Sequence, residues 1–257
     1  MNINLENKTF IVCGATSGFG HAVADRIIQE GGSIYAIART EEKLRELKDA
    51  YNSQVEILTG DITQSDTIHR LVKTIASEKI HGILINAGGP PAMTFIETKL
   101  KDWDEAYQTL LRWKVELTKA LLPKFIEQKY GRFLFIESAS VKQPLENLVL
   151  STSLRLSVVG FVKTLSQEMP DKGVTFNIMA PGYHYTQAVE RLIRKKAEMN
   201  NLTLKKAREE IESAIPMKTT GDVDKFASLA VWLLSPLSEY VTGQVYAVDG
   251  GVIKSTL

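Results

Sequence analysis

The chain has 257 residues, of which 44% are hydrophobic and 24% charged, a composition typical of a globular protein. Its 31 basic and 30 acidic residues leave a formal net charge of +1, so no field of the whole protein indicates nucleic acid or a membrane as partner. The single cysteine, Cys13, excludes an intrachain disulfide and paired-cysteine metal sites, and we expect no bound metal.

The first eight residues lack both a basic head and a long apolar stretch, so we expect no signal peptide. No run of about 18 apolar residues occurs, which argues against a membrane-spanning helix. These features predict a cytoplasmic protein. Cys13 ends the apolar run that begins at Phe10, where a small thiol is better suited to packing than to redox chemistry.

Short apolar runs alternate with amphipathic stretches along the chain. The runs predicted as strands are Thr9–Cys13, Ser33–Ala38, Val55–Leu58, Gly82–Asn86, Arg132–Glu137, Val174–Ala180 and Gln244–Val248. The predicted helices are Phe19–Glu30, Glu41–Tyr51, Ser65–Glu78, Asp102–Lys129, Ser151–Met169 and Asp222–Leu234. Buried strands separated by helices predict an α/β fold: a doubly wound (Rossmann) parallel sheet of about seven strands, with helices on both faces. One domain covers residues 1–257.

The stretch at about 183–218 interrupts this alternation. Apolar residues at helical spacing predict two amphipathic helices that carry many lysines and arginines. One interpretation is a solvated helical surface, and the other is a lid over a site at the carboxyl end of the preceding strand.

A glycine turn joins the first strand to the first helix. Gly14 permits a tight turn, Gly18 lets the backbone approach a pyrophosphate, and Gly20 allows helix and strand to pack closely. The free N–H groups of the helix N-terminus, around Thr16, Ser17 and Phe19, suit phosphate binding. The pattern predicts a dinucleotide site, and the alternative is a glycine-rich turn without a ligand.

The second strand ends at Ala38-Arg39-Thr40, without the acidic residue that usually binds the ribose of NAD. Arg39 can instead form a charge-assisted pair with a 2′-phosphate, with Thr40 or Ser17 as further donors. This favours NADP(H) over NAD(H). The alternative is a solvated arginine at a strand end.

Several motifs together match one known family over about residues 5–252. They are Gly14-x-x-x-Gly18-x-Gly20, Asp61-Ile62, Asn86-Ala87-Gly88, Pro181-Gly182 with Thr186, and the tail from Tyr240 to Gly251. The chain resembles the short-chain dehydrogenases/reductases, in particular their 3-oxoacyl-carrier-protein-reductase-like branch. The resemblance implies that Asp61 and Ile62 line an adenine pocket and that Pro181, Gly182 and Thr186 lie beside the nicotinamide. It also implies a homo-oligomer, a tetramer in most such proteins.

The family's catalytic set of Asn, Ser, Tyr and Lys is changed here. Ser138 occupies the serine position, where it would hydrogen-bond a substrate carbonyl. Counting onward without a gap places Ser151 at the tyrosine position and Arg155 at the lysine position, and Leu110 stands in place of the asparagine. We expect Arg155 to hold the nicotinamide ribose.

These changes alter the acid–base chemistry that the resemblance implies. A serine hydroxyl is a much weaker acid than a phenol and has a shorter reach, and arginine does not readily release a proton. We therefore expect ordinary ketone reduction to be impaired. Ser138, Ser151 and Arg155 are the predicted catalytic residues.

Three interpretations remain open. The chain is an NADP(H)-dependent oxidoreductase whose small-molecule substrate needs little acid catalysis, such as a conjugated enone. Alternatively, another residue supplies the proton, with candidates His184, Tyr183, Tyr185, Lys142 and Glu146. Alternatively, the protein binds NADP(H) without turnover, as a sensor or partner subunit.

Overall fold

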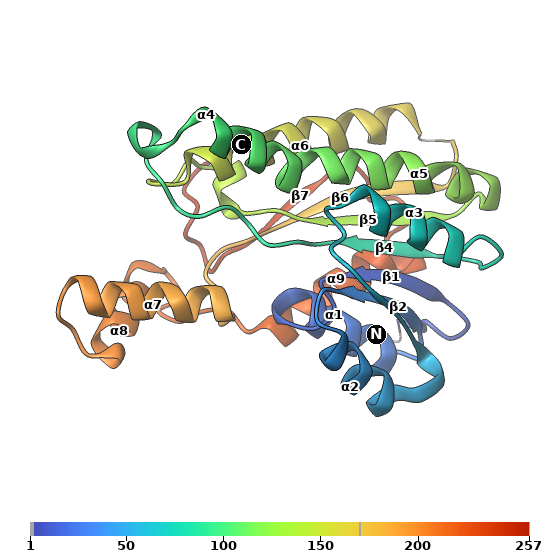
Figure 1. The fold of residues 1–257 in the computed structure, drawn as a ribbon, viewed down its shortest axis with the longest axis horizontal. Helices are drawn as coiled ribbons and strands as arrows, with labels where there is room; N and C mark the ends of the chain where they lie inside the picture. The colour runs from blue at the N-terminus through green and yellow to red at the C-terminus, as the bar shows by residue number, and fades with distance from the viewer. Residues whose placement is uncertain (1–2, 170, 257) are drawn as a thin grey trace.

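A seven-stranded parallel sheet forms the centre of the computed structural model, which describes residues 3–169 and 171–256 (Figure 1). Its strands are β1 (Thr9–Cys13), β2 (Ser33–Ala38), β3 (Val55–Thr59), β4 (Gly82–Ile85), β5 (Gly131–Ile136), β6 (Val174–Pro181) and β7 (Val245–Val248). The strand order is β3-β2-β1-β4-β5-β6-β7. The order reverses between β1 and β4, and in doubly wound sheets ligands bind in the crevice at such a switch point.

Helices cover both faces of the sheet, which confirms the predicted Rossmann-like architecture. The helices are α1 (Gly18–Gln29), α2 (Glu41–Tyr51), α3 (Ser65–Thr74), α4 (Leu100–Tyr107), α5 (Trp113–Gln128), α6 (Val149–Glu168), α7 (Gln187–Met199), α8 (Leu204–Ala214) and α9 (Val223–Leu234). The buried side chains of α1, α2 and α9 form one hydrophobic core, and those of α3, α5 and α6 form a second core on the opposite face.

The central strands are mostly apolar because both of their faces are covered, and the polar exceptions Arg132 of β5 and Thr175 and Asn177 of β6 are buried as well. All six residues of β5, for example, are buried. This is why the sequence shows continuous apolar runs rather than alternation, and why the strand positions could be predicted within one or two residues.

One predicted helix, Asp102–Lys129, contains a π-helical turn that the prediction missed. The chain stays helical throughout: α4 ends at Tyr107, the π-helical turn spans Gln108–Arg112, and α5 runs from Trp113 to Gln128. Two side chains hydrogen-bond to backbone carbonyls at this point, Thr109 Oγ1 to Glu105 at 2.8 Å and Trp113 Nε1 to Thr109 at 2.8 Å. Hydrophobic spacing cannot distinguish one widened turn from an ordinary one, since the buried face continues through it.

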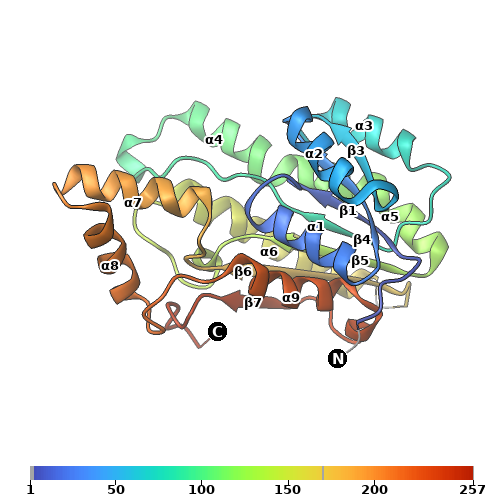
Figure 2. The same cartoon turned by 90° about the horizontal axis from the view of Figure 1, so that it is seen from below.

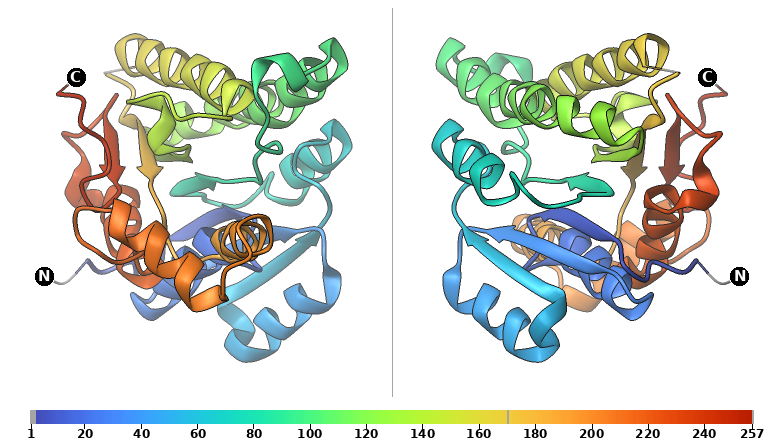
Figure 3. Two further views of the ribbon diagram at one scale, coloured as in Figure 1. Left: turned by 90° about the vertical axis from the view of Figure 1, so that its left-hand side faces the viewer. Right: turned by 90° about the vertical axis from the view of Figure 1, so that its right-hand side faces the viewer.

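The two helices predicted for the insertion are α7 and α8. They follow β6 and extend to one side of the sheet and its covering helices (Figures 1 and 2), and they lie in front of the sheet in the left-hand view of Figure 3. Their buried residues Ile193, Ala197, Ala207 and Ile211 form a small cluster separate from the two main cores. The pair is therefore held mainly by its own packing.

The apolar side chains of the long helices α5 and α6 lie mostly in the second core. Leu117 and Leu121 are core residues, and Phe161 packs against the same core. Only Leu156 of this group is exposed, at 44%. Within the described part of the chain, no helix combines the length and apolarity needed to cross a membrane.

Candidate functional site

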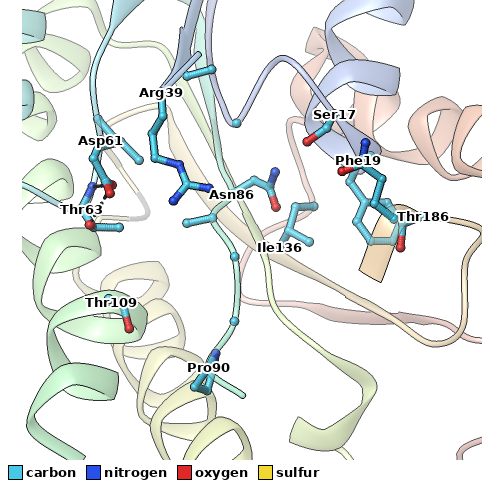
Figure 4. A pocket seen from close by; sticks show the side chains of 18 of the residues that line it. Ser17, Phe19, Arg39, Asp61, Thr63, Asn86, Pro90, Thr109, Ile136 and Thr186 are labelled. Atoms are coloured by element: carbon cyan, nitrogen blue, oxygen red, sulfur yellow. Dashed lines mark hydrogen bonds between the residues drawn. The ribbon is translucent and has the colours of Figure 1, made fainter. Parts of the chain in front are cut away.

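A cavity of about 800 Å³ lies at the carboxyl ends of the central strands (Figure 4). Its lining includes the predicted cofactor residues Gly14, Thr16, Ser17, Gly18, Phe19, Arg39, Thr40, Asp61, Ile62, Asn86, Ala87, Gly88, Arg155 and Thr186. The volume falls in the range of small-molecule and cofactor sites. Residues more than 170 positions apart in the sequence thus meet at one place.

The glycine turn has the backbone geometry that a close ligand contact requires. Gly14 and Gly18 have φ angles of +70° and +54°, in the left-handed region. A Cβ at Gly14 would lie 2.9 Å from Asn86 Nδ2, and a Cβ at Gly20 would lie 2.1 Å from the Gly14 carbonyl oxygen. Gly20 does not line the cavity within the part that the structure describes, and it acts by letting α1 pack against the turn.

Basic side chains line the far end of the cavity, beyond β2. Arg39 extends into the space between Asp61 and Asn86 (Figure 4). Lys43, in the first turn of α2, lines the same corner. Neither forms a salt bridge in the described ranges 3–169 and 171–256. Asp61, in contrast, accepts hydrogen bonds from the backbone and hydroxyl of Thr63, at 3.0 and 2.8 Å.

Three charged side chains, Lys114, Glu137 and Arg155, meet beneath the other end of the cavity and form what we call the buried triad. The Glu137 carboxylate is fully buried and accepts hydrogen bonds from Lys114 Nζ at 2.5 Å and from Arg155 Nη1 at 2.8 Å. The Lys114 side chain is 2% exposed and that of Arg155 is 8% exposed. Burial lowers the pKa of Lys114 to about 8, with Glu137 opposing the shift and Arg155 adding to it.

Ser151 also contacts the buried triad. Arg155 Nε donates to Ser151 Oγ at 3.1 Å, and Arg155 Nη1 makes a longer contact of 3.4 Å with the Ile136 carbonyl. The remaining nitrogen, Nη2, has no hydrogen-bond partner among the described residues and lies 3.1 Å from a Cβ built at Gly89. Arg155 and Gly89 both line the cavity, whereas Ser151 is not among its described lining residues.

Ser138 lies at the end of β5, next to Glu137. It is half-buried, and its Oγ accepts a hydrogen bond from the Ser140 backbone at 3.2 Å, so it caps a short 3-10 turn. The described lining of the cavity does not include Ser138. Pro181 and Gly182 lie at the end of β6, where a Cβ at Gly182 would approach Asp249 to 2.7 Å, and they too are outside that lining.

The alternative proton donors lie elsewhere. His184 is buried with its ring edge-on to Phe19 and Phe226, and burial lowers its pKa. Tyr183 packs against the α7–α8 cluster. Tyr185 is exposed, with the Arg208 guanidinium 5.1 Å from its ring.

The two candidate proton donors in the loop after Ser138, Glu146 and Lys142, also lie away from the main cavity. Glu146 lines a second, shallower cavity of about 460 Å³ near Met93 and Thr152. Lys142 ends the 3-10 turn that Ser138 caps. None of the five candidates is among the described residues that line the main cavity. In the described ranges no group of three His, Cys, Asp or Glu residues is arranged to hold a metal ion.

Sequence reasoning missed Lys43, Glu137, Lys114 and Arg191 of α7, of which all but Lys114 line the cavity. A signal existed for two of them. Lys114 precedes Leu117 and Leu121 on the buried face of α5, and Glu137 follows a strand of buried residues. A charged residue on a buried face needs a partner, because an unpaired buried charge is costly.

Comparison with known proteins identifies similar proteins over almost the whole chain. Residues 14–253 match the family model described as enoyl-(acyl carrier protein) reductase. The chain is 28% identical over 256 residues to the 3-oxoacyl-acyl-carrier-protein reductase FabG of Thermotoga maritima, covering 98% of this chain and 100% of the relative. It is 24% identical over 258 residues to the NADPH-dependent reductase BacG of Bacillus subtilis, covering 98% and 100%.

A solved structure has the same fold. The L-sorbose reductase of Gluconobacter frateurii, complexed with NADPH and L-sorbose, superimposes with a TM-score of 0.92 at 24% identity, covering 99% of this chain and 100% of that chain. At this identity the likeness establishes the fold. The order and packing of strands and helices in this chain are thus those of the solved reductase.

Proposed function

The chain belongs to the short-chain dehydrogenase/reductase family, whose relatives here are oxidoreductases, and from that premise we propose that it uses NADP(H) to reduce a small-molecule conjugated enone or other activated carbonyl compound. The glycine turn would receive the pyrophosphate at the N-terminus of α1. Arg39 and Lys43 would face the 2′-phosphate at the other end of the same cavity.

The residues present fit such a cofactor. A side chain at Gly14 or Gly20 would fill the turn, and the Ser17 side chain, at the N-cap of α1, makes no capping hydrogen bond. The NADPH-dependent relative BacG and the NADPH complex of the sorbose reductase support the choice of cofactor. The bound nicotinamide would supply hydride.

The observation that carries the proposal is the placement of Arg155. Its guanidinium is fixed by Ser151 and Glu137 and still offers Nη2 at the cavity wall. A permanent cation held beside the nicotinamide-side ribose stabilises, through its charge, the negative charge that develops on a neighbouring substrate oxygen, but it does not protonate that oxygen. An enone suits this site, because hydride addition at its β-carbon gives an enolate whose α-carbon solvent can protonate later.

A second candidate is an NADP(H)-binding protein without turnover. It is favoured by the absence of the Ser138 and Ser151 side chains from the described cavity lining. The oxidoreductase activity of the relatives supports the enzyme instead, and the buried triad is compatible with both candidates because each requires bound NADP(H).

The test is to measure NADPH and NADH binding and then follow cofactor oxidation with matched ketones and enones. We expect tighter NADPH binding and turnover of the enone of each pair. Turnover of simple 3-oxoacyl esters at the family's usual rates would contradict the role given to the altered residues. Binding of NADPH with no oxidation by any acceptor would favour the non-catalytic candidate.

The proposal also includes a cytoplasmic homo-oligomer, with a tetramer implied by the family. The exposed Leu156 on α6 is compatible with a subunit contact. A mass measurement in solution tests this part independently of catalysis.

A further inference from the structure

The buried triad combines features that a structural salt bridge does not need. Glu137 is a fully buried carboxylate with one cation on each oxygen, Lys114 on Oε1 and Arg155 on Oε2. Burying three charges costs free energy, and apolar residues of similar volume often stabilise a core as well or better. The geometry that these charges fix is therefore a candidate for a functional role.

The hydrogen bonds of Arg155 divide its guanidinium into a held side and a free side. Nε is held by Ser151 Oγ at 3.1 Å and Nη1 by Glu137 Oε2 at 2.8 Å. Nη2 faces the cavity wall at Gly89 and has no partner among the residues described. Because the guanidinium is planar, fixing two of its nitrogens also fixes the direction in which the third one donates.

The Glu137 carboxylate is itself held against rotation. Its second oxygen accepts from Lys114, which comes from α5, while Arg155 comes from α6 and Glu137 from the end of β5. Three elements are thereby tied together at one point below the cavity. Without Lys114 the carboxylate keeps Arg155 but loses this second anchor.

We propose that Glu137 is the positioning residue for Arg155, with Lys114 as the anchor of its second carboxylate oxygen, so that Nη2 is directed at the nicotinamide-side ribose of bound NADP(H). Ser151, which we place at the family's tyrosine position, belongs to the same arrangement, because its hydroxyl oxygen is the second side-chain acceptor that holds Arg155. The inference rests on the proposed function, since it requires that the cavity bind the dinucleotide.

Positioning and net charge make opposite predictions for two variants. Lys114→Met leaves a Glu137–Arg155 pair with no net charge, and in this pair Glu137 still accepts the hydrogen bond from Arg155. The double variant Lys114→Met/Glu137→Met restores the net charge of +1 that the buried triad has, but it removes the acceptor for Arg155. Both variants avoid leaving two buried cations face to face, and isosteric apolar replacement of buried ion pairs is generally tolerated.

The experiment measures the dissociation constants of NADPH and of 2′,5′-ADP, which lacks the nicotinamide ribose. We expect Lys114→Met to weaken NADPH binding by roughly threefold or less and the double variant by roughly tenfold or more. The affinity for 2′,5′-ADP should change by less than about twofold in both variants, because this fragment does not reach Arg155.

Three outcomes would overturn the inference. One is NADPH binding by the double variant that is as tight as that of the wild type, or tighter than that of Lys114→Met, as net charge alone requires. Equal weakening of NADPH and 2′,5′-ADP would indicate a general structural defect instead of positioning. Failure of the wild type to bind NADPH would overturn both the proposed function and this inference. If the wild type binds NADPH and the double variant binds it equally well, only this inference is overturned.

Discussion

At the residue scale, we propose that Arg39 determines the choice of cofactor. Its side chain extends into the cavity at the end of β2 and has no salt-bridge partner in the described chain. Its position was readable from the sequence because a residue that directly follows a buried strand must lie at the carboxyl edge of the sheet.

We expect Arg39→Ala to weaken NADPH binding by roughly tenfold, because one charge-assisted hydrogen bond is worth about 1.5–3 kcal/mol and Arg39 is partly solvated. NADH binding should stay within about twofold. Arg45→Ala is the matched control, since Arg45 lies on α2 but is 69% exposed and pairs with Glu41. Titration of both cofactors by fluorescence gives the result, and equal losses for NADPH and NADH would rule out contact with a 2′-phosphate.

We expect cofactor binding to depend on pH through Lys114. Its pKa of about 8 means that the ammonium is charged at neutral pH and loses its proton in mildly alkaline solution. The groups facing it are the Glu137 carboxylate, the Arg155 guanidinium and the Trp113 ring. Deprotonation lowers the net charge of the buried triad from +1 to zero.

We therefore expect the wild-type affinity for NADPH to fall roughly threefold as the pH rises through about 8, because an anionic ligand loses attraction. Lys114→Met should bind NADPH at every pH with the affinity that the wild type has above pH 8, and it should show no transition in this range. Binding isotherms at closely spaced pH values test this, and a transition that persists in Lys114→Met would assign it to another group.

The residue scale also shows where sequence reasoning stopped. Counting from motifs proposes Ser138, Ser151 and Arg155 as site residues, but it does not identify the residues that surround them. Glu137 and Lys114 are 23 positions apart, and their contact depends on how α5 lies against the end of β5. No local pattern contains that information.

At the scale of elements, the packing of α1 against the glycine turn holds the cofactor site in shape. Gly20 lies in the first turn of α1, where any side chain would meet the Gly14 carbonyl oxygen. The turn and the helix N-terminus must move together if that contact is disturbed.

We expect Gly20→Ala to destabilise the protein by roughly 1–3 kcal/mol or more and to abolish tight NADPH binding, because a Cβ at 2.1 Å forces the turn to shift. Gly160→Ala is the matched control: Gly160 lies within α6 with nothing within 4 Å of a built Cβ, so alanine should stabilise by about 0.5–1 kcal/mol. Denaturant unfolding compares the two. Similar stabilities would contradict the close-packing account of Gly20.

We expect the α7–α8 pair to be the part of the fold that is least coupled to the sheet. Because its apolar cluster is separate from both main cores, we expect Ile193→Ala to loosen the pair locally. Hydrogen exchange of residues 187–214 should accelerate, while the protection of β1 to β6 stays unchanged. Ile27→Ala, in the core beneath α1, should instead lower the stability of the whole protein. A comparable global loss in Ile193→Ala would show that the pair is coupled to the sheet.

Element boundaries were predictable where burial is uniform and were missed where hydrogen bonding decides. The seven strands and the helix pair of the insertion follow from apolar patterning. The π-helical turn at Gln108–Arg112 does not, because its widened turn is set by hydrogen bonds that leave the apolar spacing unchanged.

At the scale of the whole molecule, the fold brings the glycine turn, Arg39 and Arg155 to one edge of one sheet. The alternation of strands and helices was sufficient to predict this edge as the binding site. The chemistry was not predictable to the same degree, because it depends on which substrate oxygen Arg155 faces.

The most direct test of the account is the fate of hydride from NADPH labelled with deuterium at the transferred position, with cyclohexenone as acceptor. We predict one deuterium at the β-carbon of the saturated ketone, with the carbonyl group intact, as mass spectrometry and NMR would show. Deuterium on a carbinol carbon would mean that the altered site still performs ordinary carbonyl reduction. Absence of transfer to this or any other activated acceptor would contradict the assignment as an enzyme.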